Sequence, residues 1–285
     1  MTRRASFLTG IAVLLVCFVP IRAHAQVGAP FQLNLHEPWS MAIGAGDTMY
    51  IADRLNYRIV QLSPEGAVLG RWGGFVRRYY DAGPMGVAVD VDGAVYSTDP
   101  AGSRILKFSP AGVVLAAFGT FGDGPGQFLV PVGVAVDGRG FIYVADALAN
   151  RVEELSPLGR PVREWGTWGT RPGQFEHPFG VAIDGAGHVD VSDHLGGRVQ
   201  AFSADGVYLR QWGHAGRRPG QFLLPFGLTV DRQNDLYVAD ELNRRVQELA
   251  PDGTVLHVWG GMHSTLFADP SGAALDGRGR LYVLD

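Results

Sequence analysis

The sequence predicts an all-β fold, a six-bladed β-propeller of four-stranded antiparallel blades, because one set of short strand-like pieces recurs along the chain. A proline before an apolar run recurs with spacings of 46, 47, 47, 47 and 45 residues, at Pro38, Pro84, Pro131, Pro178, Pro225 and Pro270. An aspartate that ends a second run keeps the same spacings, at Asp53, Asp99, Asp146, Asp193, Asp240 and Asp285. A period in the forties, made of strand-like pieces, is typical of a propeller.

Residues 1–25 precede the first repeat and have the features of a signal peptide. Arg3 and Arg4 form a basic start, an apolar stretch follows, and Ala23–Ala25 is a small-x-small cleavage site. The apolar stretch is too short to act as a stop-transfer helix. We therefore expect an exported protein, periplasmic or extracellular, whose propeller covers residues 26–285. The sequence leaves open whether the Sec or the twin-arginine route exports it.

Each repeat is predicted to contain four strands, as the third repeat illustrates. Residues 132–136 form a continuous apolar run, which is expected of a strand buried on both faces. A glycine-containing turn separates this run from a second strand at 141–145. The third strand, 151–155, alternates polar and apolar residues and is expected to have one wetter face, and 162–166 forms the fourth. Polarity rises from the first strand to the last, as in a blade that runs from channel to rim.

Two recurring features are interpreted as structural. An aromatic residue followed by glycine ends each fourth strand, and we expect this ring to seal one blade against the next. Each aspartate that ends a second strand is followed five residues later by an arginine in the five complete repeats. We expect this pair to close the loop by an ion pair or backbone hydrogen bonds, and not to form a ring of catalytic carboxylates.

Composition excludes several classes of function. Cys17 is the only cysteine and lies in the predicted signal peptide, so the mature chain has no disulfide and no thiolate metal site. Removing that peptide with its three arginines leaves 21 basic and 28 acidic residues, a net charge of −7. Nucleic-acid binding relies on clustered Lys and Arg, so this acidic balance disfavours nucleic acid as a partner. No transmembrane segment is expected after cleavage.

The last blade is predicted to be incomplete at the C-terminus. Residues 281–285 match a second strand, and the third and fourth strands that should follow are missing. By counting, the N-terminus supplies at most one of them, which predicts an imperfectly closed ring. Residues 31–35 are the alternative, because they alternate well enough to pair along 281–284 and close it.

The repeats resemble the NHL repeat family over essentially the whole mature chain. The fifth repeat has the motif most fully, as Gln221-Phe222-x-x-Pro225-x-Gly227-x-x-x-Asp231 and Tyr237-Val238-Ala239-Asp240-x-x-Asn243-x-Arg245-Val246-Gln247. Blade one departs from it at Ser40 and Gly44. The resemblance implies a β-propeller, usually with six blades. It leaves function open, because NHL-like propellers serve as extracellular sensors, as protein- or RNA-binding modules, and as lyases such as the peptide-amidating lyase.

That lyase is disfavoured residue by residue. The resemblance places its zinc histidines just after the strand-one proline, at the mouth of the channel. This chain has no histidine there, and the six residues are Trp39, Met85, Val132, Phe179, Phe226 and Ser271. The disulfides expected of that lyase are also impossible without cysteine.

The channel mouth is nevertheless the predicted site, because binding residues favour loops on a rigid scaffold. Trp39, Phe179 and Phe226 are predicted to form an apolar collar there, with His177 and His194 on the same face. We expect a binding or interaction scaffold for a protein, peptide or small ligand, with no catalytic residue, metal or cofactor assigned. The alternative is a metal-dependent lyase or lactonase centred on the two histidines and Asp193. The sequence does not identify the ligand or the oligomeric state.

Overall fold

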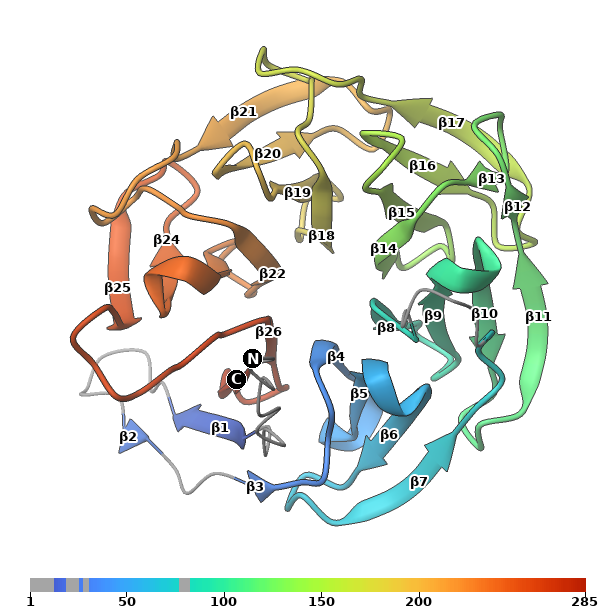
Figure 1. Cartoon of the computed structure of the whole chain (residues 1–285), viewed down its shortest axis with the longest axis horizontal. Coiled ribbons are helices and arrows are strands. Elements are labelled where there is room, and N and C mark those ends of the chain that lie inside the picture. Colours follow the sequence, from blue (N-terminus) through green and yellow to red (C-terminus); the bar gives the residue numbers. More distant parts are fainter. Residues whose placement is uncertain (1–12, 19–25, 28–30, 77–82) are drawn as a thin grey trace, which may run out of the picture.

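The chain folds into a β-propeller whose antiparallel sheets are arranged in a ring (Figure 1). The computed structural model describes residues 13–18, 26–27, 31–76 and 83–285. Five of its sheets are four-stranded, and each is built by one repeat. Within the described residues no helix is long and apolar enough to cross a membrane.

The strands of each blade follow one another from the channel to the rim (Figure 1). The first strands are β4 (Pro38–Ile43), β8 (Val87–Val89), β14 (Pro131–Val136), β18 (Pro178–Ile183) and β22 (Pro225–Val230). The second strands are β5 (Met49–Asp53), β9 (Val95–Asp99), β15 (Ile142–Asp146), β19 (Val189–Asp193) and β23 (Leu236–Asp240). The third strands are β6 (Arg58–Leu62), β10 (Arg104–Phe108), β16 (Arg151–Leu155), β20 (Arg198–Phe202) and β24 (Arg245–Leu249). The fourth strands are β7 (Val68–Trp72), β11 (Val114–Phe118), β17 (Pro161–Trp165), β21 (Tyr208–Trp212) and β25 (Val255–Gly260).

Short elements lie in the connections. The parallel pair β12 (Thr120–Phe121) and β13 (Gln127–Phe128) lies in the loop before β14. Three-residue 3-10 turns are η1 (Ala45–Asp47), η2 (Arg54–Asn56), η3 (Pro100–Gly102) and η4 (Glu241–Asn243). The last three follow second strands, on the face that also carries the entrances to the first strands.

Burial follows the predicted gradient, with one correction. All of β15 is buried, whereas β17 is exposed at most of its positions. The expectation of a wetter face on the third strand is wrong for β16, which is buried throughout. Glu153 and Glu154 on it are only 1% and 2% exposed, because the neighbouring blades cover both faces of the sheet.

The glycine two places after the proline allows neighbouring first strands to approach closely. A Cβ built on Gly133 would lie 1.9 Å from the carbonyl oxygen of Phe179 in the next blade. The same clash with the next repeat's backbone occurs at Gly86, Gly180 and Gly227, at 2.3, 2.5 and 2.7 Å. The repeated Pro-x-Gly therefore sets how tightly the blades close around the channel.

The recurring aromatic residues seal the blades, as predicted. Trp72 has its ring 5.5 Å from Tyr50 of its own blade and 5.9 Å from Phe108 of the next. Trp165 repeats the contact, 5.9 Å from Phe202 of the fourth blade. Each ring thus joins two sheets.

The predicted Asp–Arg loop closure is confirmed in four blades. The Nε of the arginine lies 2.6 to 2.8 Å from the aspartate in the pairs Arg58–Asp53, Arg104–Asp99, Arg198–Asp193 and Arg245–Asp240. The aspartates are fully buried and also accept backbone N–H groups of the loop that enters the blade. In the third blade Arg151 pairs with Glu164 at 2.7 Å instead, and Asp146 closes the loop by accepting the backbone N–H groups of Leu129 and Val130, both at 2.8 Å. These aspartates are structural, because they are buried and their carboxylate oxygens already accept hydrogen bonds within the blade.

The two ends of the described chain share one sheet. Its path is β2 (Gln26–Val27), β1 (Val13–Phe18), β27 (Leu281–Leu284) and β26 (Gly272–Leu275), and β3 (Phe31–Gln32) also pairs with β1. The register of β1 on β27 runs from Leu14 opposite Leu284 to Cys17 opposite Leu281. Strands from both ends close many propellers, since closure removes an open sheet edge.

This sheet corrects the predictions about the last blade. The expectation that the N-terminus supplies at most one strand was counted from Gln26, whereas in the full chain β1, which lies before Gln26, and β2 continue the sheet beyond β27 and fill the predicted gap. Residues 31–35 do not pair along 281–284, since β1 occupies that edge. β1 falls within the predicted signal peptide, whose basic start and cleavage site lie outside the described residues.

Candidate binding site at the channel mouth

Three aromatic rings from three blades meet at the channel mouth, as the sequence predicted. Trp39 has its ring 5.0 Å from Phe226 and 6.0 Å from Phe179, and the two phenylalanine rings lie 4.9 Å apart. The pair Trp39–Phe226 and the pair Phe179–Phe226 meet edge to face, which is the favourable arrangement for aromatic rings. We call these three residues the collar.

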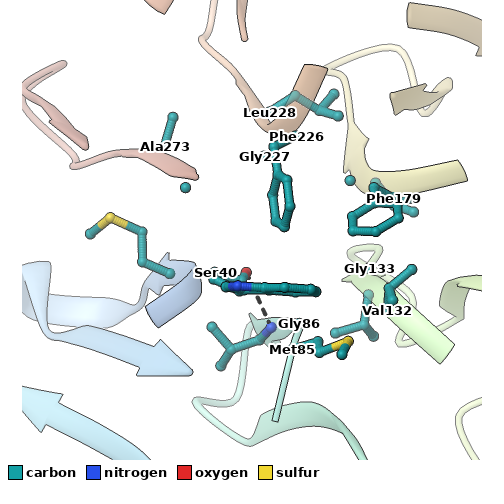
Figure 2. A pocket seen from close by; sticks show the side chains of 17 residues that line it. Ser40, Met85, Gly86, Val132, Gly133, Phe179, Phe226, Gly227, Leu228 and Ala273 are labelled. Carbon is teal, nitrogen blue, oxygen red and sulfur yellow. Dashed lines mark hydrogen bonds between the residues drawn. The ribbon is translucent and has the colours of Figure 1, made fainter. Parts of the chain in front are cut away.

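The collar borders a pocket formed by the first strands. Figure 2 shows Phe179 and Phe226 directed into it, with Met85 and Val132 at the wall. The lining is apolar side chains and the glycines of the Pro-x-Gly repeat, and Ser40 adds a hydroxyl that accepts a hydrogen bond from the Val87 N–H at 3.3 Å. No charged side chain lines this pocket within the described residues, so it suits an apolar group.

His194 extends the collar. Its ring stacks on Phe179 at 4.3 Å and meets the edge of Phe226 at 5.5 Å. Its Nδ1 lies 3.2 Å from the carbonyl oxygen of Pro225, and a carbonyl only accepts, so Nδ1 carries the proton. Burial lowers the pKa of His194 to about 4, and the neighbouring His177 acts in the same direction.

We expect His194 to stay neutral throughout the neutral pH range. Its pKa in the folded protein lies below the ordinary 6.5, so the stability that the neutral ring contributes is lost as the pH falls from about 6.5 to 4. NMR titration of the His194 ring protons should give a midpoint near pH 4, with no change above pH 6. A midpoint at 6 or above would show that the ring is not enclosed by the collar.

His177 joins the site through its backbone. Its carbonyl accepts the His194 N–H at 3.1 Å, and its own N–H donates to Asn150 Oδ1 at 3.0 Å. Asp193 does not join the two histidines, because its carboxylate accepts from Arg198 and from the Glu176 N–H. The metal-binding arrangement of these three residues, which the sequence offered as the alternative, is therefore not assembled.

Sequence reasoning missed Arg54 and Glu37. The guanidinium of Arg54 lies over the Trp39 ring, 4.4 Å from its centroid, and forms an ion pair with Glu37. The repeat pattern could have pointed to Arg54. Arg54 directly follows the aspartate that ends β5, and His194 holds the same repeat position in the fourth blade. Both side chains stack on the aromatic residue that follows their own blade's proline.

The backbone before the proline is left-handed in the three blades that supply the collar. The φ angles are 48° at Glu37, 61° at His177 and 54° at Leu224. The equivalent residues of the other three repeats, Gly83, Val130 and Asp269, have no positive φ. A side chain disfavours this region, and a following proline disfavours helical backbone further. The collar thus coincides with three strained positions.

A group of three carboxylates lies elsewhere. Asp231, Asp235 and Glu248 have oxygens within 4.8 Å of one another. Asp231 and Asp235 flank the hairpin between β22 and β23, at the face opposite the mouth. Glu248 is engaged by the Tyr237 hydroxyl at 2.8 Å and by His257 at 2.5 Å. This group has no part in the channel-mouth site.

Comparisons with known proteins show the fold. No known protein-family profile matches the sequence, and no curated protein matches it. Among solved structures, a nidogen/laminin complex contains a chain with 17% identity and a TM-score of 0.65, covering 92% of this chain and 97% of that one. A catalytically inactive virginiamycin B lyase from Staphylococcus aureus with quinupristin has 15% identity and a TM-score of 0.64, with coverage of 86% and 76%. A gluconolactonase from Xanthomonas campestris has 18% identity and a TM-score of 0.62, with coverage of 87% and 86%.

These structures include lyase, lactonase and protein-complex propellers. At such low identity the similarity supports a shared β-propeller fold and does not transfer an activity.

Proposed function

We propose that this chain is an exported NHL-repeat propeller that acts as a binding or interaction scaffold at its channel mouth. The ligand is a protein, a peptide or a small molecule with an apolar group that enters between the collar rings. In this proposal the ring counts six blades, the sixth is built on β26 and β27, and β1 completes that sheet only in the uncleaved chain, because cleavage after Ala25 removes it. The signal-like features of residues 1–25 support export.

The coincidence of collar and backbone strain carries the proposal. A left-handed non-glycine residue costs on the order of 1–3 kcal/mol, and such strain clusters at functional sites. At the position before the proline it occurs at Glu37, His177 and Leu224, in the blades that place an aromatic ring at the mouth, whereas the second and third blades have left-handed non-glycine residues only before the third strand, at Ser103 and Asn150. Packing of the channel alone does not require a left-handed residue before the proline. The other three repeats have Met85, Val132 and Ser271 after the proline, and none of them has a positive φ before it.

The alternative, a metal-dependent lyase or lactonase, has less support in the residues. His177 and His194 do not share a ligand site with Asp193, and His194 already uses Nδ1 on a backbone carbonyl. The only group of three potential ligands among the described residues lies at the opposite face. The lyase and gluconolactonase similarities keep the enzyme testable, by assaying lactone hydrolysis with and without a chelator.

Fluorine NMR of protein labelled with 5-fluorotryptophan tests the binding function. Trp39 is assigned through Trp39→Phe, and apolar fragments are screened for shifts of its signal. We expect binders that move Trp39 and spare Trp72, and that lose affinity about tenfold in Phe179→Ala, which removes a collar ring. Phe121→Ala is the control, because Phe121 is 74% exposed in the loop before β14. A collar that no fragment perturbs would contradict the proposal.

A further inference from the structure

The hairpin turns between first and second strands, at the face opposite the mouth, contact one another across blades. In two places a side-chain oxygen of one turn accepts a backbone N–H of the turn in the neighbouring blade. Asn234 Oδ1 accepts the Gly185 N–H at 2.8 Å, between the fourth and fifth blades. Asp47 Oδ1 accepts the Gly277 N–H at 3.0 Å, between the sheet of β26 and β27 and the first blade. Both oxygens come from the same turn position, where φ is 65° at Asn234 and 58° at Asp47.

Glycine at the donor position leaves room for the accepting oxygen. A Cβ built on Gly185 would lie 3.0 Å from Asn234 Oδ1, and one built on Gly277 would lie 3.3 Å from Asp47 Oδ1. A side chain at either glycine would therefore press on the oxygen, which is the close approach that glycine permits. Three of the other four turns have a side chain at the donor position, at Ala45, Val91 and Arg232.

Gly138, in the third blade, is the remaining glycine at the donor position, and no side chain of the fourth blade supplies its oxygen. The residue at the acceptor position of the fourth blade is Gly187. Among the described residues the Gly138 N–H forms no hydrogen bond, and a Cβ built on Gly138 meets no atom within 4 Å. A groove lies between the two turns, and both glycines line it. The third and fourth blades thus have the donor and the space of the other two contacts and lack the acceptor.

The charges around the groove favour a neutral acceptor. Asp137 and Asp184 line the groove, one from each turn, and Arg139 forms an ion pair with Asp137 at 2.8 Å. The contact made by Asn234 has the same surroundings, because the two turns that it joins begin with Asp184 and Asp231. An amide is therefore the acceptor that this chain uses between two such turns.

The carboxylate of Asp47 has different surroundings. Arg278 Nε lies 4.0 Å and Arg280 Nη2 3.9 Å from it, and its own turn begins with Gly44 in place of an aspartate. A carboxylate in the groove would meet Asp184 without this pair of arginines. A primary amide suits the groove better, since its oxygen accepts an N–H while its NH₂ group donates to a carboxylate.

We propose that the groove between the third and fourth blades binds a primary carboxamide, as in an asparagine or glutamine side chain of a peptide. The amide oxygen accepts the Gly138 N–H, and the NH₂ group donates to Asp184. Apolar side chains in the lining contact the rest of the ligand, and these are Ile183, Ala186 and Ala204. This site does not depend on the channel-mouth function, because the groove lies at the opposite face.

Three capped amino acids test the site on the full chain: the N-acetyl N-methylamides of asparagine, aspartate and alanine. The readout is the backbone amide signal of Gly138 in nitrogen-15 NMR. We expect a saturable shift with capped asparagine and none with capped alanine, which shares its backbone amides. Capped aspartate should bind about fivefold more weakly, because its charge meets Asp184.

Gly187→Asn supplies the acceptor from the chain itself. The φ of Gly187 is 82°, a region that asparagine tolerates, and a Cβ there meets no atom within 4 Å. We expect the Gly138 signal to move without ligand, and capped asparagine to lose its effect on it. Gly279→Asn is the matched control, since Gly279 holds the same turn position between β26 and β27, with a φ of 77° and no atom within 4 Å. It should leave the response of Gly138 unchanged.

Gly138→Ala removes the space above the donor. Its Cβ would press on a bound oxygen, so we expect the affinity for capped asparagine to fall about tenfold, measured at the same backbone amide. Equal binding of capped asparagine and capped alanine would overturn the site, as would a capped-asparagine response that persists in both Gly187→Asn and Gly138→Ala. Capped aspartate that binds as tightly as capped asparagine would overturn the carboxamide as the ligand.

Discussion

Replacing Gly133 with alanine is expected to lower the free energy of unfolding by about 3 kcal/mol or more, because the new methyl group has no room. Its Cβ would lie 1.9 Å from the carbonyl oxygen of Phe179 and 3.2 Å from the Val181 N. Both atoms belong to the backbone of β18, so no side chain can rotate away. Relief requires the third and fourth blades to separate at the channel, where the repeat holds them closest.

Gly138→Ala is the matched control in the same blade. Gly138 lies in the turn between β14 and β15, has no positive φ, and a Cβ there meets no atom within 4 Å. Urea denaturation of both variants should show a large loss for Gly133→Ala and a change within about 0.5 kcal/mol for Gly138→Ala. Equal, small losses would mean that the blades adjust freely and that Pro-x-Gly does not set their spacing.

The repeat predicted most of the fold because each landmark has a local physical cause. A proline fixes the entry of the first strand, and the structure begins β4, β14, β18 and β22 at that proline. The collar followed from the same register, since residues at one repeat position must meet at one radius of a ring. Trp39, Phe179 and Phe226 are therefore together in the structure.

Features that depend on partners from other repeats were not predictable in this way. Ring closure by β1 pairs residues near opposite ends of the chain, and no periodicity marks β1 as a blade strand. The stacking of Arg54 on Trp39 depends on a side-chain direction that spacing does not give. The left-handed residues before the prolines run against local preference, so a sequence-based expectation goes the wrong way there.

Glu153 is a further departure that only the other blades explain. The same position on the third strand holds Gln200 and Gln247 in the fourth and fifth blades. Each glutamine accepts a glycine N–H of the entering loop at 2.9 Å through its oxygen. Each also donates through its amide nitrogen to a backbone carbonyl, at 2.7 and 2.8 Å.

In the third blade Glu153 keeps half of this arrangement. Oε1 accepts the Gly126 N–H, while Oε2 has no hydrogen bond and lies 3.8 Å from the Arg151 guanidinium. The carbonyl of Gln127, which is the equivalent of the acceptor carbonyl in the other two blades, accepts from Arg151 Nη2 at 3.0 Å. In the other two blades the glutamine amide is a second donor to that carbonyl, beside the arginine, and in the third blade a protonated Glu153 takes the place of the amide. Burial accordingly raises the pKa of Glu153 from 4.5 to about 7, against the attraction of Arg151.

Glu153→Gln is therefore expected to make the protein more stable at pH 8 and to leave it nearly unchanged near pH 4.5. Because the folded pKa of Glu153 lies above its ordinary value, the folded state binds more protons between pH 4.5 and 7. The stability of the wild-type chain falls as the pH rises through that window and stays low above it. Glutamine keeps both hydrogen bonds at every pH, so the variant should be more stable than the wild type by as much as about 3 kcal/mol at pH 8, at about 1.4 kcal/mol per pKa unit.

Urea denaturation of both proteins from pH 5 to 8 gives the difference in their free energies of unfolding, from which titrations common to the two cancel. Gln247→Glu should introduce the same loss of stability with rising pH in the fifth blade, whereas parallel curves for all three proteins would show that Glu153 is buried in its charged form.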